Sequence, residues 1–178
     1  MKNQQERTFN MPKKILLSFL LCVAYLWSYS QNERPYREEY VLKLPVNSKQ
    51  FYEQKVNRSP FFVKDNILQI YPGEKIFVEV ESDTSTITSM KVVKENLNPE
   101  KTITIELSQE VKDRISEHMM LEINNPFNKV LEYKAMMFIV GHDKWISTDV
   151  LPVKAKLTSF EMWNDVITTL VLSDWKLK

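Results

Sequence analysis

The sequence predicts an all-β fold, because apolar and polar residues alternate in many short runs separated by turn signals. Alternation is the period of a strand whose two faces meet different surroundings. Tyr71-Pro72-Gly73-Glu74 and Asn125-Pro126-Phe127-Asn128 are typical turn sequences between such runs. We therefore expect a mostly antiparallel β-sandwich of immunoglobulin-like type, with one or two short helical turns. A closed barrel is the structural alternative.

The stretch from Met119 to Val140 carries the clearest pattern. Its first strand is expected to turn Met119, Leu121 and Ile123 inward. After the Asn125–Asn128 turn, a second strand places a further apolar set on one face: Leu131, Tyr133, Ala135, Met137 and Ile139. This stretch therefore predicts a long hairpin with a buried face, which needs a second sheet or a helix to cover it.

Earlier segments repeat this pattern. Residues 40–44 form the first expected strand, and residues 67–71 and 76–81 read as a hairpin around a type II turn. Strands are also expected over 86–94 and 102–107.

Helical turns are expected at two places. The segment from Ser108 to Ile115 has a capping serine and an acidic residue at its start. Thr158 to Glu161 matches a capping box, which predicts one helical turn that ends at Trp163. Residues 146–153 and 166–172 are expected to be the last strands.

Residues 1–30 have the pattern of a secretory signal peptide. Lys13 and Lys14 precede the apolar run 15–27, and Ser28 and Ser30 supply small residues before Gln31. The run is shorter than the ~20 apolar residues of a membrane span. We therefore expect export by a cleaved signal to a periplasmic or secreted location, with no membrane span after cleavage and an uncleaved anchor as the alternative.

Residues 31–39 are polar and are expected to be a flexible lead, which leaves residues 40–178 as a single β-sandwich domain. Four of the 24 basic and one of the 23 acidic residues lie in residues 1–30, so residues 31–178 have a net charge of −2. The only cysteine, Cys22, also lies in residues 1–30. Near neutrality gives no reason to expect nucleic acid as a partner.

The residue inventory argues against the common cofactor and catalytic motifs. Gly73 and Gly141 are the only glycines, so no glycine cluster can cradle a phosphate. His118 and His142 are the only histidines, and neither has a sequence neighbourhood with further histidine or cysteine ligands. Met119, Met120, Met136 and Met137 could ligate Cu(I), but Met119 and Met137 fall on the inward parity of their strands, which favours core packing. We expect no cofactor, no metal and no readable catalytic residue.

The candidate partner-binding residues are His142, Asp143 and Trp145. They belong to a polar loop that begins at Gly141, and a rigid aromatic residue on such a loop can anchor a partner at low entropic cost. The alternative is that Trp145 closes one end of the sandwich as a core residue.

Two motifs in the last third of the chain resemble uncharacterised secreted bacterial immunoglobulin-like sandwich domains. They are the pattern N-P-F-x-x-x-L-x-Y, formed by Asn125, Pro126, Phe127, Leu131 and Tyr133, and the ending from Glu161-Met162-Trp163 to Leu172. The resemblance implies a fold and a compartment, and it implies no activity.

These observations favour an extracytoplasmic binding or interaction module of unknown specificity, whose partner is another extracytoplasmic protein or a glycan. A hydrolase, or a carrier of an apolar ligand, is the alternative. A pocket lined by converging titratable groups would favour the enzyme, and a flat apolar patch would favour the module.

The signal-peptide interpretation makes a first prediction. Protein recovered from its native host should begin at Gln31, because the small residues at Ser28 and Ser30 end the apolar run. Intact-mass spectrometry measures this directly. A mature protein that still contains residues 15–27 would contradict cleavage.

Overall fold

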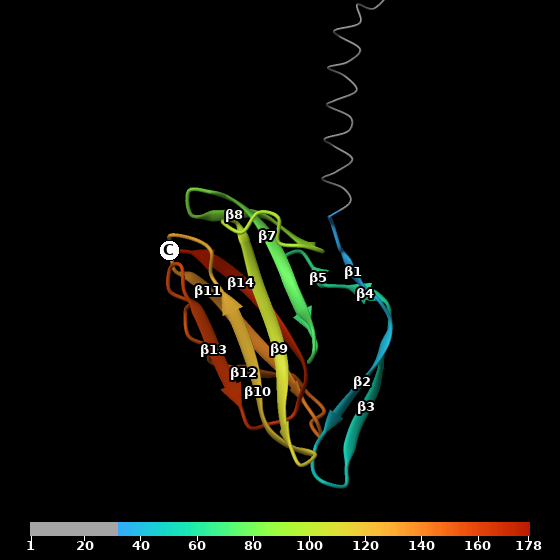
Figure 1. Ribbon diagram of the computed structural model, residues 1–178. Helices are drawn as coiled ribbons and strands as arrows, with labels where there is room; N and C mark the ends of the chain where they lie inside the picture. Colours follow the sequence, from blue (N-terminus) through green and yellow to red (C-terminus); the bar gives the residue numbers. More distant parts are fainter. Residues whose placement is uncertain (1–31) are drawn as a thin grey trace, which may run out of the picture. The chain divides into compact units, whose positions relative to one another are not determined.

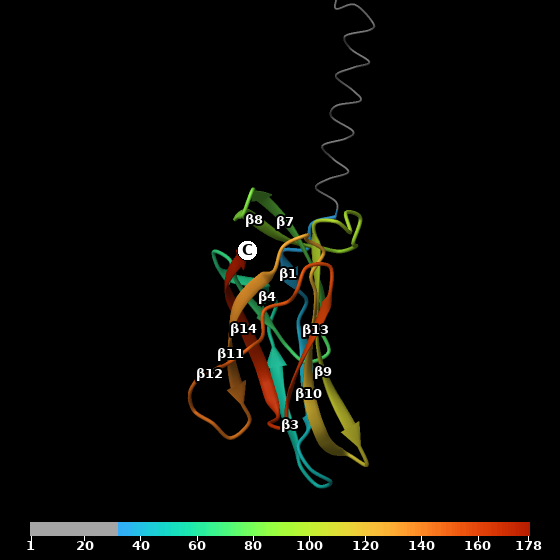
Figure 2. The same ribbon diagram turned by 90° about the vertical axis from the view of Figure 1, so that its left-hand side faces the viewer.

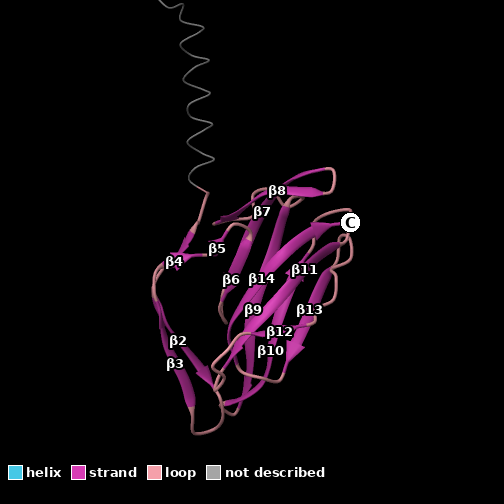
Figure 3. Cartoon of the chain, turned by 180° about the vertical axis from the view of Figure 1, so that it is seen from behind, coloured by secondary structure: helices cyan, strands magenta, loops and turns pink. Residues whose placement is uncertain are grey.

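The computed structural model describes residues 32–178, and within them every regular element is a β-strand (Figure 3). The expected signal at residues 1–30 lies outside this range. Residues 34–178 form one compact unit. No helix in the described part of the chain is long and apolar enough to cross a membrane. The all-β, antiparallel prediction is confirmed.

Two five-stranded antiparallel sheets face each other (Figure 2). The first sheet has the order β13-β10-β9-β7-β8, with strands β13 (Thr158–Trp163), β10 (Ile115–Asn124), β9 (Thr102–Lys112), β7 (Lys75–Asp83) and β8 (Thr86–Val93). The second has the order β12-β11-β14-β6-β5, with strands β12 (Ile146–Thr148), β11 (Leu131–Ile139), β14 (Ile167–Leu177), β6 (Ile67–Ile70) and β5 (Phe62–Lys64).

Four further strands form two small pairs beside the large sheets (Figure 1). They are β1 (Tyr36–Arg37) with β4 (Ser59–Pro60), and β2 (Tyr40–Pro45) with β3 (Phe51–Val56). The β2–β3 hairpin buries Leu42, Leu44 and Val56 in a second apolar cluster with Tyr71 and Val166. This hairpin therefore has its own small core, which includes residues near the ends of the large strands.

The alternating residues of β10 and β11 fill the main core, as the sequence predicts. Leu121, Ile123 and Leu131 are at most 1% exposed, and Tyr133 is 7% exposed. Met119 and Met137 are buried with them, which fits packing rather than ligation. The inward faces of both sheets contribute to this cluster.

The expected hairpin from Met119 to Val140 is wrong, because β10 and β11 belong to different sheets. The Asn125 side chain fixes the connection between them. Its Nδ2 donates to the carbonyls of Lys129, Val153 and Lys154, and its Oδ1 accepts from the Phe127 amide. The side chain is 1% exposed, so it satisfies a buried loop that passes from one sheet to the other.

The segment between β6 and β7 makes the same kind of connection. The Glu74 amide donates to the Tyr71 carbonyl, and Gly73 has φ +88, as a type II turn requires. The turn is therefore as predicted, but β6 and β7 lie in different sheets and do not pair. An alternating strand looks the same whether its neighbour in sequence pairs with it or faces it across the core.

Both expected helical turns are strands. β9 continues to Lys112 and turns into β10 through Asp113 and Arg114, whose φ values of 52 and 67 are left-handed. The expected turn from Thr158 to Trp163 is β13, paired along its length with β10. In both places the ladder with β10 overrides the local capping signals.

The core assignment makes a second prediction. Leu121→Ala should lower the free energy of unfolding by about 2–5 kcal/mol, because it empties a fully buried site. Urea titration measures the loss, and Leu97→Ala is the control because Leu97 is 63% exposed. Equal midpoints for the two variants would contradict this account of the core.

Candidate functional site

The most densely bonded group in the described chain is the guanidinium of Arg37, in the segment expected to be a flexible lead. The structure differs from that expectation, since Arg37 lies in β1 and is 1% exposed. The segment contains no alternation that would mark it as part of the fold. The arginine is held instead by groups far away in sequence.

All five N–H donors of Arg37 have acceptors. Nε and Nη2 bind the two carboxylate oxygens of Glu74 at 2.8 and 3.3 Å. The remaining bonds go to Ser59 Oγ, the Pro60 carbonyl and the Gln69 carbonyl, the last at 2.6 Å. A bidentate, fully satisfied arginine is the form in which a buried positive charge is tolerated.

Aromatic rings complete the surroundings of this charge. The guanidinium carbon lies 4.6 Å from the ring centre of Phe61 and 5.0 Å from that of Tyr71, within the range of cation–π attraction. Glu74 also accepts a hydrogen bond from the Tyr71 amide at 2.9 Å. We call this cluster of Arg37, Glu74, Phe61 and Tyr71 the arginine clasp. It joins β1, β4, β6 and the β6–β7 turn.

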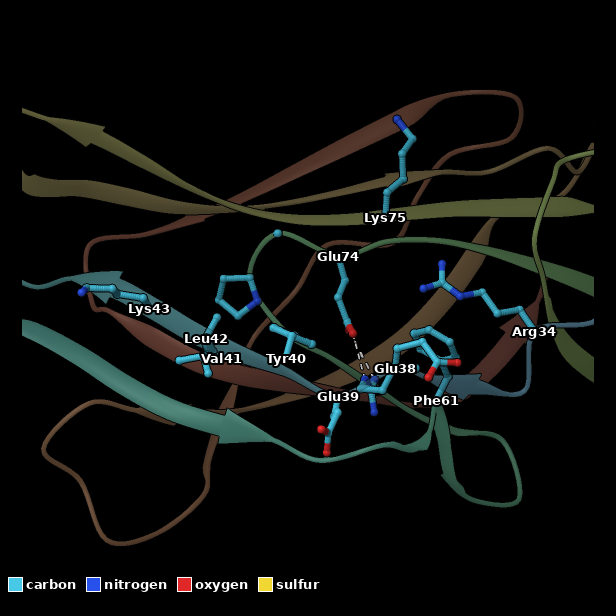
Figure 4. A pocket seen from close by; sticks show the side chains of 13 residues that line it. Arg34, Glu38, Glu39, Tyr40, Val41, Leu42, Lys43, Phe61, Glu74 and Lys75 are labelled. Atoms are coloured by element: carbon cyan, nitrogen blue, oxygen red, sulfur yellow. Dashed lines mark hydrogen bonds and ion pairs between the residues drawn. The ribbon is translucent and has the colours of Figure 1, made fainter.

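A groove of about 480 Å³ opens beside the clasp (Figure 4). Residues 37–43 form one side and residues 72–75 the other. In Figure 4, Lys43 lies at one end and Arg34 at the other, with Tyr40 and Glu38 between them. Charged side chains of both signs therefore surround an aromatic and aliphatic surface.

The side of the groove formed by β2 is an unpaired strand edge. The Val46 amide donates to the Gln50 carbonyl, which marks that pair as hydrogen-bonded in the β2–β3 ladder. Bonded and non-bonded pairs alternate along an antiparallel ladder. Val41 and Lys43 therefore direct their N–H and C=O groups away from β3, toward the other edge of β2.

The end of this edge confirms its orientation. Pro45 falls on the same alternation as Val41 and Lys43, and its carbonyl accepts a hydrogen bond from Gln109 Nε2 of β9 at 2.8 Å. The free edge of β2 thus faces the first sheet. It is tied to β9 at its Pro45 end and to the β6–β7 turn by the arginine clasp at the other.

Burial shifts the pKa values of the two tyrosines beside the clasp, Tyr40 and Tyr71. It raises the pKa of Tyr40, with the nearby Glu74 carboxylate adding to the rise and Arg37 opposing it. Burial likewise raises the pKa of Tyr71, again opposed by Arg37. The Tyr40 hydroxyl is buried and has no hydrogen-bond partner within residues 32–178. Both groups therefore stay neutral over the physiological range.

The residues singled out from the sequence lie elsewhere. His142 and Asp143 are exposed in the turn after β11, and Trp145 is 39% exposed just before β12. The Trp145 ring packs edge-to-face on Phe138 with 5.5 Å between centres. Trp145 is thus a surface residue of the second sheet, and it does not meet the groove residues.

The histidines do not join a metal-ligating cluster. Among residues 32–178, no group of three or more His, Cys, Asp or Glu side chains is placed to hold a metal ion. His118 is partly exposed on β10, where its cross-strand neighbour is Glu110.

Comparison with known proteins gave no match: no family model, no curated protein and no solved structure resembles this chain significantly.

The arginine clasp makes a third prediction. Arg37→Met or Glu74→Met alone should cost about 3–5 kcal/mol of stability, because each leaves the partner charge buried and unpaired. The double variant should cost less than either single change, since no uncompensated charge remains.

Denaturant titration of the three variants tests the coupling. Lys75→Met is the control, because it breaks an exposed pair with Glu106 that contributes about 0–1 kcal/mol. A double-variant loss equal to the sum of the two single losses would show that Arg37 and Glu74 act independently.

Proposed function

We propose that this chain is an exported binding module, a β-sandwich of immunoglobulin-like type, that takes an extended segment of another extracytoplasmic protein into the groove beside β2. The observation that supports this proposal is the unpaired edge of β2, which lies along the wall of an open groove of about 480 Å³. A strand edge with free main-chain groups accepts a peptide by adding a strand.

The surroundings of the edge favour a polypeptide over a glycan. Val41 and Lys43 present main-chain donors and acceptors two residues apart, which is the repeat of an extended peptide. Side chains of both signs border the same groove, including Arg34, Glu38 and Lys75. A peptide can match such a border with alternating charges, while its backbone pairs with β2.

Arg37 holds the wall of the groove in place, and its guanidinium does not bind the peptide. All its donors are already bonded, so recruiting it would break the clasp. Recognition therefore rests on the β2 edge and on the exposed side chains around it. This arrangement gives a rigid site, which lowers the entropic cost of binding.

A fourth prediction tests strand addition. Val41→Pro removes an N–H that faces the groove and leaves the β2–β3 ladder intact, because proline is tolerated at an unpaired edge. Peptides selected from a random library against the unmodified chain should bind Val41→Pro at least about ten-fold more weakly.

Glu53→Pro is the matched control. Glu53 pairs with Lys43 and lies on the same alternation, so its main-chain groups face the outer edge of β3, away from β2. The affinity of the Glu53→Pro variant for the selected peptides should stay within about two-fold of the affinity of the unmodified chain. A selection that yields no binding peptide, or peptides that bind both proline variants equally, would defeat the proposal.

A further inference from the structure

The outer edge of β13 is a six-residue sheet edge with little of the usual protection, since Glu161 is its only charged residue. Edge strands are normally shortened, bulged, charged or covered, because their free main-chain groups invite another strand. β5 and β12 have only three residues each, and β5 pairs through a register shift. The edge of β8 is covered where the Arg34 amide donates to the Val92 carbonyl.

β13, in contrast, spans six residues without proline, lysine or a register shift. Its exposed side chains are large and apolar, with Phe160 55% and Met162 63% exposed. Leu151 and Leu157, in the loop before the strand, are 72% and 53% exposed. The edge thus combines free main-chain groups with apolar surface.

The direction of the main-chain groups follows from one hydrogen bond. The Asn125 amide donates to the Leu157 carbonyl, which marks Asn125 and Leu157 as a bonded pair at the end of the β10–β13 ladder. By alternation, Ser159, Glu161 and Trp163 direct their main-chain groups to β10. Thr158, Phe160 and Met162 therefore direct theirs outward, and no hydrogen bond to another segment is seen for these groups within residues 32–178.

We propose that a second copy of this chain pairs with β13 about a two-fold axis through Phe160, joining the two first sheets into one ten-stranded sheet. In this register Phe160 faces Phe160 of the second copy, and Thr158 faces Met162. All three outward residues then join bonded pairs, giving roughly six main-chain hydrogen bonds. The two exposed phenylalanines become a cross-strand aromatic pair.

Charge selects this register. With the axis at Phe160, Glu161 lies opposite Ser159 of the second copy, and a hydroxyl can donate to a carboxylate. With the axis one residue later, Glu161 would lie opposite Glu161 of the second copy, and this pair of like charges would be destabilising. The strand is therefore complementary to itself in the arrangement that also uses every outward main-chain group. The Glu161 side chain is already oriented, since its Oε1 accepts from the Leu151 amide at 2.7 Å.

Light scattering after size-exclusion chromatography of the full chain tests the proposal. The unmodified chain should be mostly dimeric at about 100 µM, which corresponds to a dissociation constant of roughly 10 µM or lower. Phe160→Lys places two like charges at the axis and should weaken the dimer at least about ten-fold. Leu97→Lys is the control, because it removes a similarly exposed apolar residue from a loop remote from β13 in sequence.

A cross-link reports the register even where a variant is less stable. In a Cys22→Ser background, Phe160→Cys should form a disulfide-linked dimer under mild oxidation, because bonded strand pairs bring Cα atoms to about 5.5 Å. Leu97→Cys should cross-link much more slowly. A monomeric chain, a dimer insensitive to Phe160→Lys, or equal cross-linking of the two cysteine variants would overturn the inference.

Discussion

A buried positive charge that must be fully satisfied is the constraint on which the N-terminal part of the fold depends. Taking a guanidinium out of water costs several kcal/mol unless its donors and its charge are matched. Arg37 meets that requirement only when Glu74, Ser59, Pro60 and Gln69 converge on it. One side chain of β1 therefore fixes three further chain segments: β4, β6 and the β6–β7 turn.

The position of β2 follows from the arginine clasp. Tyr40 begins β2 three residues after Arg37, so the clasp sets where that strand starts. At the other end, the hydrogen bond from Gln109 to the Pro45 carbonyl ties the strand to β9. Between these two points β2 has no partner on its inner edge, and the groove is the space that remains. The binding site that we propose is thus a consequence of anchoring a strand at its two ends.

The sequence predicts strands better than it predicts their partners. Alternation placed Leu121, Ile123, Leu131 and Tyr133 in the core, because side-chain parity depends only on the local backbone. It could not show that β10 and β11 lie in different sheets, since a strand alternates in the same way beside its neighbour or across from it. The decisive interactions are those of the Asn125 side chain, two of which reach the distant carbonyls of Val153 and Lys154, which no local pattern indicates.

The site was hidden from the sequence for a related reason. Arg37 stands in a polar run, and its ion-pair partner Glu74 is 37 residues away, so no periodicity connects them. The one local signal was Pro72-Gly73, which predicted the turn that presents Glu74 but not what Glu74 would bind. The exposure of Trp145 followed more simply from its polar loop.

The two free edges of the fold differ in how they can be used. The β2 edge lies in a groove bordered by charges, so only a chain that fits between residues 37–43 and 72–75 can reach it. The β13 edge is open and apolar. In the two-fold register its single charged residue, Glu161, does not lie opposite Glu161 of the second copy. Because the edges lie on different sheets, one can pair with a second copy while the other stays free. A dimer formed through β13 would then present two β2 grooves at once, and a partner with two matching segments would gain avidity from linking them.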